Sequence, residues 1–265
     1  MRETHVRPIF LCTRCGELAY ENTKNSTARD RTAYAMKFQL MLAPMEGITD
    51  AAFRTLAHQN GADLTFTEMA RIANLARNRK GEMARIAIPD STPTQIQLVG
   101  SKLAEYERFL SVFKPSEGFH GFNLNLGCPS PSFIRQGIGA AMIKRVTRVQ
   151  EIINIIDGHG YECSVKLRLG LNQYEKEKGA YLNLIKNVDA SFFIVHARTA
   201  AQTERDPADF TVYSRCIATG KKIVANGEIK TREQAMEMKE KGMYGAMIGK
   251  TAIDNPGIFR ELDVG

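Results

Sequence analysis

The feature that most restricts the fold of this chain is an alternation of strand-like and helix-like segments that begins at Phe38. The strand candidates are short, apolar and often β-branched or aromatic, as strands buried on both faces should be. They cover 38–43, 64–68, 94–99, 121–126, 163–169, 191–196, 222–226 and 244–248. Amphipathic segments of helical period lie between them, for example Ala51–Asn60, Ser101–Phe113, Arg148–Gly158 and Thr231–Lys241. Eight such units in a row predict a closed, parallel (β/α)8 barrel, the TIM-barrel class of α/β fold.

The length of the chain agrees with this architecture. The chain has 265 residues, and a barrel of this class commonly has about 250. A doubly wound open sheet is the alternative, although it usually needs fewer repeats. We therefore expect one barrel over residues 36–265, preceded by a polar N-terminal extension over residues 1–35.

The extension contains one pair of cysteines. Cys12 and Cys15, followed by Gly16, resemble one knuckle of a zinc ribbon. A structural zinc site needs four ligands, usually from two such pairs, and the second pair is absent from this sequence. His5 could add a ligand, and a second molecule could supply the others. The alternative is a disordered leader ahead of Met36 as the first residue. We predict no metal in the barrel.

Charge and cysteine usage suggest a partner and a compartment. The formal net charge is +7, which suits a polyanionic partner such as RNA; a generally basic surface without such a partner fits equally well. No apolar run reaches the roughly 18 residues of a membrane helix, and the start of the chain lacks the apolar stretch of a signal peptide. The five cysteines form no disulfide framework. We expect a soluble, cytoplasmic protein with no membrane partner.

Active sites of such barrels form at the C-terminal ends of the strands. Asn226-Gly227 and Gly249-Lys250 end the seventh and eighth predicted strands, where barrels commonly bind phosphate. Glycine lets backbone N–H groups approach an anion closely, and Lys250 adds charge. The alternative is that these glycines only form tight turns. Their joint position favours a phosphate site.

Three reactive side chains stand at other strand ends. Cys128 lies in a Gly-Cys-Pro loop after the fourth predicted strand, where a thiol can donate a proton or act as a nucleophile. Cys163 and Cys216 fit inert packing instead. Lys166 should point into the barrel, and a buried lysine is rarely structural unless it is paired. His196 could donate to an anion or act as a general acid, or be a satisfied core histidine.

Seven motifs at these strand ends resemble those of the tRNA-dihydrouridine synthases, in order and spacing over roughly 220 residues. The motifs are APMEGITD at 43–50, QIQLVG at 95–100, NLGCP at 125–129, VKLR at 165–168, HART at 196–199, NGEI at 226–229 and NPGIF at 255–259.

The resemblance implies a bound FMN that NADPH reduces. It implies that Pro44, Met45 and Glu46 lie along the isoalloxazine ring, and that Gln97 and Lys166 hydrogen-bond the flavin. A cation there stabilises the reduced, anionic flavin. The residues that it implies for the ribityl and phosphate end are His196, Asn226, Gly227, Glu228, Gly249 and Lys250.

The resemblance also implies the reaction, in which hydride passes from flavin N5 to C6 of a uracil in tRNA and Cys128 protonates C5. Asn125 would help to place the uracil, and Arg168 and Arg198 would contact substrate. The chemistry is consistent, because the C4 carbonyl of uracil polarises the C5=C6 bond, so that hydride at C6 builds negative charge toward C5. The base must leave its stack to reach such a site.

The chain departs from the family pattern in several places. Asn123 stands where the family usually has an acidic residue, Lys250 where it often has arginine, and Ala200 where it commonly has arginine. Lysine keeps the charge but loses the bidentate fork, so FMN binding should survive. The family usually continues past the position of Gly265 with a helical domain that grips tRNA. We expect the basic surface, the extension or an accessory subunit to compensate.

Two other functions remain open on the residues. One is oxidation or reduction of a free pyrimidine, as in the dihydroorotate dehydrogenases, which also use an FMN barrel with a loop serine or cysteine. The other is a flavin-binding module that has lost turnover. The charge and the context of Cys128 favour RNA over a free pyrimidine, and retention of Cys128, Lys166 and His196 together argues against an inactive module.

Overall fold

A computed structural model describes residues 37–265. The extension, with the zinc interpretation of Cys12 and Cys15, therefore lies outside the described residues. Within them the strands are β1 (Gln39–Leu42), β2 (Thr65–Phe66), β3 (Ala70–Arg71), β4 (Thr94–Val99), β5 (Phe119–Leu126), β6 (Cys163–Leu167), β7 (Phe193–His196), β8 (Ile223–Asn226) and β9 (Gly245–Ile248).

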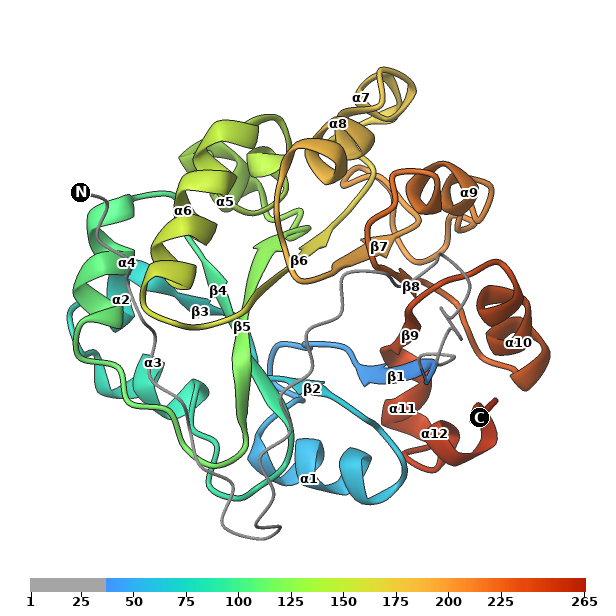
Figure 1. Cartoon of the computed structure of the whole chain (residues 1–265), viewed down its shortest axis with the longest axis horizontal. Helices are drawn as coiled ribbons and strands as arrows, with labels where there is room; N and C mark the ends of the chain where they lie inside the picture. Colours follow the sequence, from blue (N-terminus) through green and yellow to red (C-terminus); the bar gives the residue numbers. More distant parts are fainter. Residues whose placement is uncertain (1–36) are drawn as a thin grey trace, which may run out of the picture. The chain divides into compact units, whose positions relative to one another are not determined.

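The strands form one parallel sheet that curls into a barrel (Figure 1). Their order is β1-β9-β8-β7-β6-β5-β4-β2, and β3 pairs with β4 further along the same side. At the closing seam, β1 pairs with β9 from Gln39 opposite Gly245 to Leu42 opposite Ile248. On its other side β1 meets Leu64, whose carbonyl accepts the Leu42 N–H at 2.9 Å. The sheet is a nearly closed barrel, so the predicted fold is confirmed and the open-sheet alternative is wrong.

The second barrel strand differs from the prediction. Residues 64–68 were expected to form one strand, but the structure has two short ones, β2 and β3. The cause lies at Thr67, whose side-chain hydroxyl accepts the Gln97 N–H at 3.0 Å. This hydroxyl takes the place of a backbone carbonyl in the ladder, and the chain resumes pairing with β4 only at Ala70 and Arg71.

Helices fill the connections between the strands and form the outer layer (Figure 1). They are α1 (Ala51–Gln59), α2 (Ile72–Leu75), α3 (Lys80–Arg85), α4 (Leu103–Leu110), α5 (Pro131–Gln136), the 3-10 helix η1 (Gly139–Lys144), α6 (Val146–Gly158), α7 (Gln173–Glu177), α8 (Ala180–Asn187), α9 (Val212–Ile217), α10 (Arg232–Glu240), α11 (Lys250–Asp254) and α12 (Ile258–Glu261).

Local sequence explains where the helices begin. Asp50 accepts the Phe53 N–H at 2.9 Å and caps α1. Thr231 and Gln234 form a reciprocal capping box at the start of α10. Such caps satisfy N–H groups that have no partner within the helix, and each stabilises it by about 1 kcal/mol.

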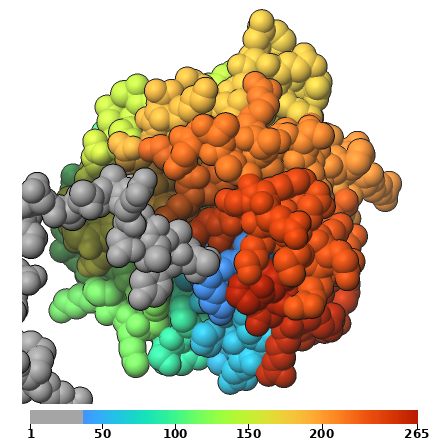
Figure 2. Space-filling model, turned by 45° about the vertical axis from the view of Figure 1, so that its right-hand side comes forward, coloured from blue at the N-terminus to red at the C-terminus, as the bar shows by residue number. Residues whose placement is uncertain are grey.

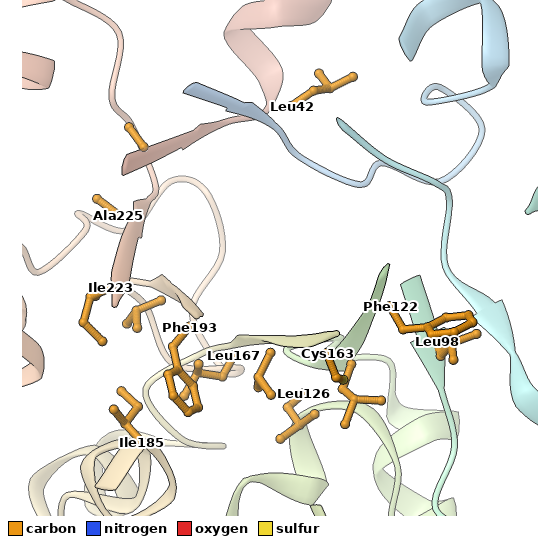
Figure 3. Close-up of a cluster of buried hydrophobic side chains, with 14 of the residues drawn as sticks. Leu42, Leu98, Phe122, Leu126, Cys163, Leu167, Ile185, Phe193, Ile223 and Ala225 are labelled. Atoms are coloured by element: carbon orange, nitrogen blue, oxygen red, sulfur yellow. The ribbon is translucent and has the colours of Figure 1, made fainter. Parts of the chain in front are cut away.

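Alternate residues of each strand pack outward against the helices. Figure 3 shows Ile185 of α8 beside Phe193 of β7 and, further along the sheet, Leu167, Leu126 and Phe122. This layer between barrel and helices is the main hydrophobic core, in which a buried leucine, isoleucine or phenylalanine contributes about 1.5–3 kcal/mol through removal from water.

The interior of the barrel is divided between apolar and polar side chains. Its apolar cluster consists of Met41, Ala43, Phe66, Phe192, Ile194, Val224 and Met247. The strands β4, β5 and β6 contribute buried polar side chains instead, which are Gln95, Gln97, Asn123 and Ser164. Polar groups in such a place need hydrogen-bond partners. This polar half lies below the strand ends that carry the predicted site.

No helix within residues 37–265 is long and apolar enough to cross a membrane.

Candidate active site

Two cavities adjoin at the C-terminal ends of the strands, with volumes of about 600 Å³ and about 210 Å³. Pro44, Lys166, Arg168 and His196 line both of them. The other predicted site residues in the larger cavity are Met45, Arg198, Asn226, Gly227, Glu228, Gly249 and Lys250. Those in the smaller cavity are Glu46, Gln97, Asn125 and Cys128. The barrel thus brings every predicted site residue to one place, although their individual roles stay predictions.

The larger cavity spans the seam between the first and last strands. In the space-filling view, the segment around β1 (blue) lies directly against the last barrel units (orange to red) (Figure 2). Gly227 has a φ of +117°, and a Cβ there would meet His196 Cδ2 at 3.0 Å. Glycine is therefore required at this position both by the backbone and by the ring beside it. At the rim, Lys250 forms an ion pair with Glu204.

Lys166 has no carboxylate partner among residues 37–265. Its Nζ donates to Asn226 Oδ1 at 2.9 Å, and no carboxylate within residues 37–265 lies within ion-pair distance of it. Burial, with a smaller contribution from Arg168, lowers the Lys166 pKa from 10.5 to about 7. An ammonium group held in this way favours an electron-rich or anionic ligand in the cavities.

His196 is neutral at ordinary pH. Burial lowers its pKa most, and the neighbouring Lys166, Arg168 and Arg198 lower it further. Arg198 Nη1, which can only donate, lies 3.3 Å from His196 Nε2. Nε2 is therefore the acceptor and Nδ1 carries the ring proton. His196 can act as a neutral hydrogen-bond donor to a ligand but not as a cation.

The loop that carries Cys128 is held by its backbone. The Cys128 N–H donates to Asn125 Oδ1 at 2.9 Å, as does the Gly127 N–H at 3.1 Å. The Cys128 carbonyl accepts the Ala140 N–H at 3.1 Å. The backbone of Cys128 is thus held at both its N–H and its carbonyl. Its thiol lines the smaller cavity together with Gln97 and Lys166. Cys128 is half-buried, so its thiol can meet a ligand.

The other two described cysteines are packing residues, as expected. Cys163 lies in β6 and Cys216 in α9, and both are buried. Burial raises the pKa of both thiols, that of Cys216 to about 12.

Arg198 and Glu46, two residues predicted to contact a ligand, also bind other groups of the chain. Arg198 donates to the carbonyls of Asp206 and Glu204 and to the Glu228 carboxylate, at 2.6, 3.3 and 2.5 Å. Its guanidinium therefore holds the loop after β7, and four of its five N–H groups have partners within the chain once the contact of Nη1 with His196 Nε2 is included. The Glu46 carboxylate accepts from Arg85 Nη1 at 2.5 Å, so it faces α3 as well as the cavity.

The structure adds residues that sequence reasoning did not select. Met69 lines the smaller cavity, and Arg205, Lys230 and Thr251 line the larger one. Lys230 and Thr251 follow glycine-ended strands, and this position in the sequence could have identified them as cavity residues. Arg205 and Met69 lie in irregular segments with no such signal. Within residues 37–265, no cluster of three His, Cys, Asp or Glu side chains could hold a metal ion.

The fold and the site together define a (β/α)8-barrel protein in which glycine-ended strands and a cysteine-bearing loop line two adjoining cavities. A family model described as dihydrouridine synthase matches residues 41–264. The chain belongs to the dihydrouridine synthase family, so the predicted resemblance and the predicted enzyme class, an oxidoreductase, are confirmed.

Individual relatives agree with this assignment. The chain is 28% identical over 234 residues to tRNA-dihydrouridine synthase B of Pseudomonas putida, covering 87% of this chain and 69% of that protein. It is also 28% identical to a probable tRNA-dihydrouridine synthase of Aquifex aeolicus, covering 85% and 73%. Among solved structures, nitroalkane oxidase from Streptomyces ansochromogenes matches with a TM-score of 0.50 at 14% identity, covering 81% of this chain and 66% of that one. That match concerns the fold alone.

Proposed function

We propose that this protein reduces uridine to 5,6-dihydrouridine in tRNA, with FMN as its cofactor and NADPH as the reductant of the flavin. The family assignment and the names of the relatives support the reaction. The observation that carries the proposal is the position of the Cys128 thiol. It lines the same small cavity as Gln97 and Lys166, and this cavity shares four lining residues with the larger cavity.

The residues of the two cavities fit FMN. The partly buried amino group of Lys166, which has no carboxylate partner within residues 37–265, suits the electron-rich carbonyl edge of a flavin ring. The glycine-ended strands β8 and β9 suit a phosphate, with Lys250 supplying charge. In this assignment, Pro44, Met45 and Glu46 flank the ring and Gln97 hydrogen-bonds it. The ribityl and phosphate end is held by His196, Asn226, Gly227, Glu228, Gly249 and Lys250. We assign FMN binding to the barrel, residues 36–265.

When bound, FMN supplies the hydride that adds to C6 of the uracil. The Cys128 Sγ–H gives its proton to C5, which completes the reduction, and the sulfur regains a proton from solvent. Asn125 holds the backbone N–H of Cys128, so it fixes the position from which the proton is given. Arg168 lines both cavities, where a cation can contact the polar edge of the substrate.

Exposed basic residues at the rim suit an RNA substrate. Arg205, Lys230 and Lys250 line the larger cavity and are exposed. Such side chains neutralise phosphates that flank a reacting nucleotide. The target uridine must leave its stack to reach Cys128, and contacts with the flanking backbone help to hold it in that state. A tRNA substrate also agrees with a cytoplasmic protein.

The test begins with the purified protein. Its visible spectrum is recorded, NADPH is added anaerobically, and unmodified tRNA is then added and assayed for dihydrouridine. We expect a yellow protein that bleaches with NADPH and leaves dihydrouridine in the RNA. Cys128→Ala should keep the flavin but lose product formation by about 100-fold or more, the usual size of general acid catalysis. Cys216→Ala, which removes a buried thiol of α9 that lines neither cavity, is the matched control and should keep activity.

Other outcomes would point elsewhere. A colourless protein that cannot take up FMN would overturn the cofactor assignment. A flavin that bleaches while the RNA stays unchanged would favour a free pyrimidine, which the same assay can test with uracil, or a requirement for an accessory subunit. A flavin that NADPH cannot reduce would favour a binding module without turnover.

A further inference from the structure

A chain of hydrogen-bonded side chains, four amides and one hydroxyl, runs from the candidate site into the barrel interior, and its upper half begins at the cysteine loop. Asn125 Oδ1 accepts the Cys128 N–H at 2.9 Å. Asn125 Nδ2 donates to Gln97 Oε1 at 2.8 Å, and Gln97 Nε2 donates to Asn123 Oδ1 at 2.7 Å. Asn125 and Gln97 line the smaller cavity, whereas Asn123 is fully buried and is not among the residues that line it.

The lower half continues from Asn123 across the barrel interior. Asn123 Nδ2 donates to Ser164 Oγ at 2.7 Å, and the Ser164 hydroxyl donates to Gln95 Oε1 at 2.5 Å. Gln95 Nε2 donates to the His120 carbonyl at 3.1 Å. Gln97, Asn123 and Ser164 stand directly opposite one another on three adjacent strands. Parallel pairing therefore brings the central members into contact.

The direction of every bond is fixed by the two ends. The backbone N–H of Cys128 can only donate, so Asn125 must turn its oxygen toward it and its nitrogen toward Gln97. The carbonyl of His120 can only accept, so Gln95 must turn its nitrogen toward it. Both constraints meet at Asn123, which must accept from Gln97 and donate to Ser164. A flipped amide anywhere would face donor with donor or acceptor with acceptor.

We propose that Asn123 is a positioning residue that holds the amides of Gln97 and Asn125, and through them the Cys128 loop, in one orientation. This inference rests on the proposed function for the meaning of the site. Only a side chain with one acceptor and one donor completes both halves, and at this size asparagine meets the requirement. Aspartate keeps the acceptor for Gln97 but leaves one acceptor too many in the lower half.

Two substitutions of Asn123 test the upper and lower halves of the hydrogen-bond chain separately. Asn123→Leu removes the acceptor of the Gln97 Nε2–H, so this buried donor loses its partner and the Gln97 amide is held only through its oxygen, by Asn125. In flavin-free protein we expect the NMR signals of the Gln97 and Asn125 side-chain amides and of the Cys128 backbone amide to move. FMN titrated into the same protein should bind about tenfold more weakly or worse, the size expected when a buried donor loses its partner. Asn123→Asp should leave the Gln97 and Asn125 signals close to those of the parent protein.

A double-mutant cycle tests the lower half. Asn123→Asp should lower the stability of the flavin-free protein, and Gln95→Met should restore part of it, because Ser164 can then donate to the new carboxylate without competition. The loss of unfolding free energy in the double variant should therefore be smaller than the sum of the losses in the two single variants. Ser164→Ala should destabilise the protein, whereas Ser191→Ala should not, because the buried Ser191 hydroxyl has no hydrogen-bond partner among residues 37–265.

The proposal is overturned if Asn123→Leu leaves both the Cys128 amide signal and FMN affinity unchanged, or if the two single effects in the cycle simply add. If Asn123→Leu does not fold, the cycle and the Asn123→Asp signals still decide. Failure of the proposed function would be recognised separately, because unmodified tRNA would then stay unreduced by the parent protein while these flavin-free measurements kept their expected pattern.

Discussion

Lys166 should make the stability of the flavin-free protein depend on pH in an unusual direction. Its pKa is lowered from 10.5 to about 7, mainly by burial, so the fold disfavours its charged form. Between these two pH values the unfolded chain holds a proton on this lysine that the folded chain lacks. The free energy of unfolding contributed by Lys166 therefore rises as pH rises from about 7 toward 10.5, and the full penalty remains below pH 7.

The size of this penalty follows from the two pKa values. The difference between 10.5 and about 7 corresponds to an upper value of about 5 kcal/mol. The ammonium group borders two cavities, and the water they admit should reduce the effect to about 2–4 kcal/mol. Lys166→Met removes the charge but also the bond to Asn226, which offsets about 1 kcal/mol.

Urea unfolding followed by circular dichroism provides the assay, since the chain has no tryptophan. At pH 6, Lys166→Met should be more stable than the parent protein by about 1–3 kcal/mol, and the difference should disappear by about pH 10. Lys186→Met, at an exposed lysine, should follow the parent protein throughout. Parallel stability curves for Lys166→Met and the parent across this range would refute the reasoning.

Three further changes have defined outcomes. Phe193→Ala in the outer core should cost about 3–5 kcal/mol in urea unfolding; a cost below 1 kcal/mol would mean that the layer between barrel and helices repacks. Gly227→Ala should weaken FMN binding, measured by fluorescence titration, because the residue has a positive φ and lies against the His196 ring; Gly158→Ala, where a Cβ meets nothing within 4 Å, is its control. Lys230→Gln should reduce the slope of log tRNA affinity against log salt by about 1, and an unchanged slope would exclude this residue from phosphate contact.

The fold could be predicted from sequence because parallel barrel strands are buried on both faces and read as short apolar runs. Alternation along the fifth predicted strand then placed Lys166 inside the barrel, as the structure has it. The break in the second strand could not be foreseen, because it depends on whether the Thr67 hydroxyl or a carbonyl accepts one N–H. The acceptor depends on the geometry between the strands, and this geometry produces no periodic pattern in the sequence.

The convergence of the candidate site residues could be predicted from the topology, whereas the contacts that each side chain makes could not. In a barrel the C-terminal ends of all strands lie at one face, whatever the conformation of the loops. Residues distant in sequence could therefore be assigned to one site from the topology alone. The direction of a long side chain at a strand end is a different matter. Arg198 lines the larger cavity, as a residue expected to contact substrate, and its guanidinium also holds the loop after β7. No local sequence rule would place the carbonyls of that loop there.

The seam between β1 and β9 has a consequence for how the protein is made. Pro44 and Met45 follow the first strand of the barrel, and Gly249 and Lys250 follow the last, yet all four line one cavity. Contacts so far apart in the chain form late, because the loop between them must close first. During synthesis the larger cavity cannot exist until the final strand has left the ribosome. Cofactor capture should therefore follow completion of the barrel, and no nascent fragment should compete for it.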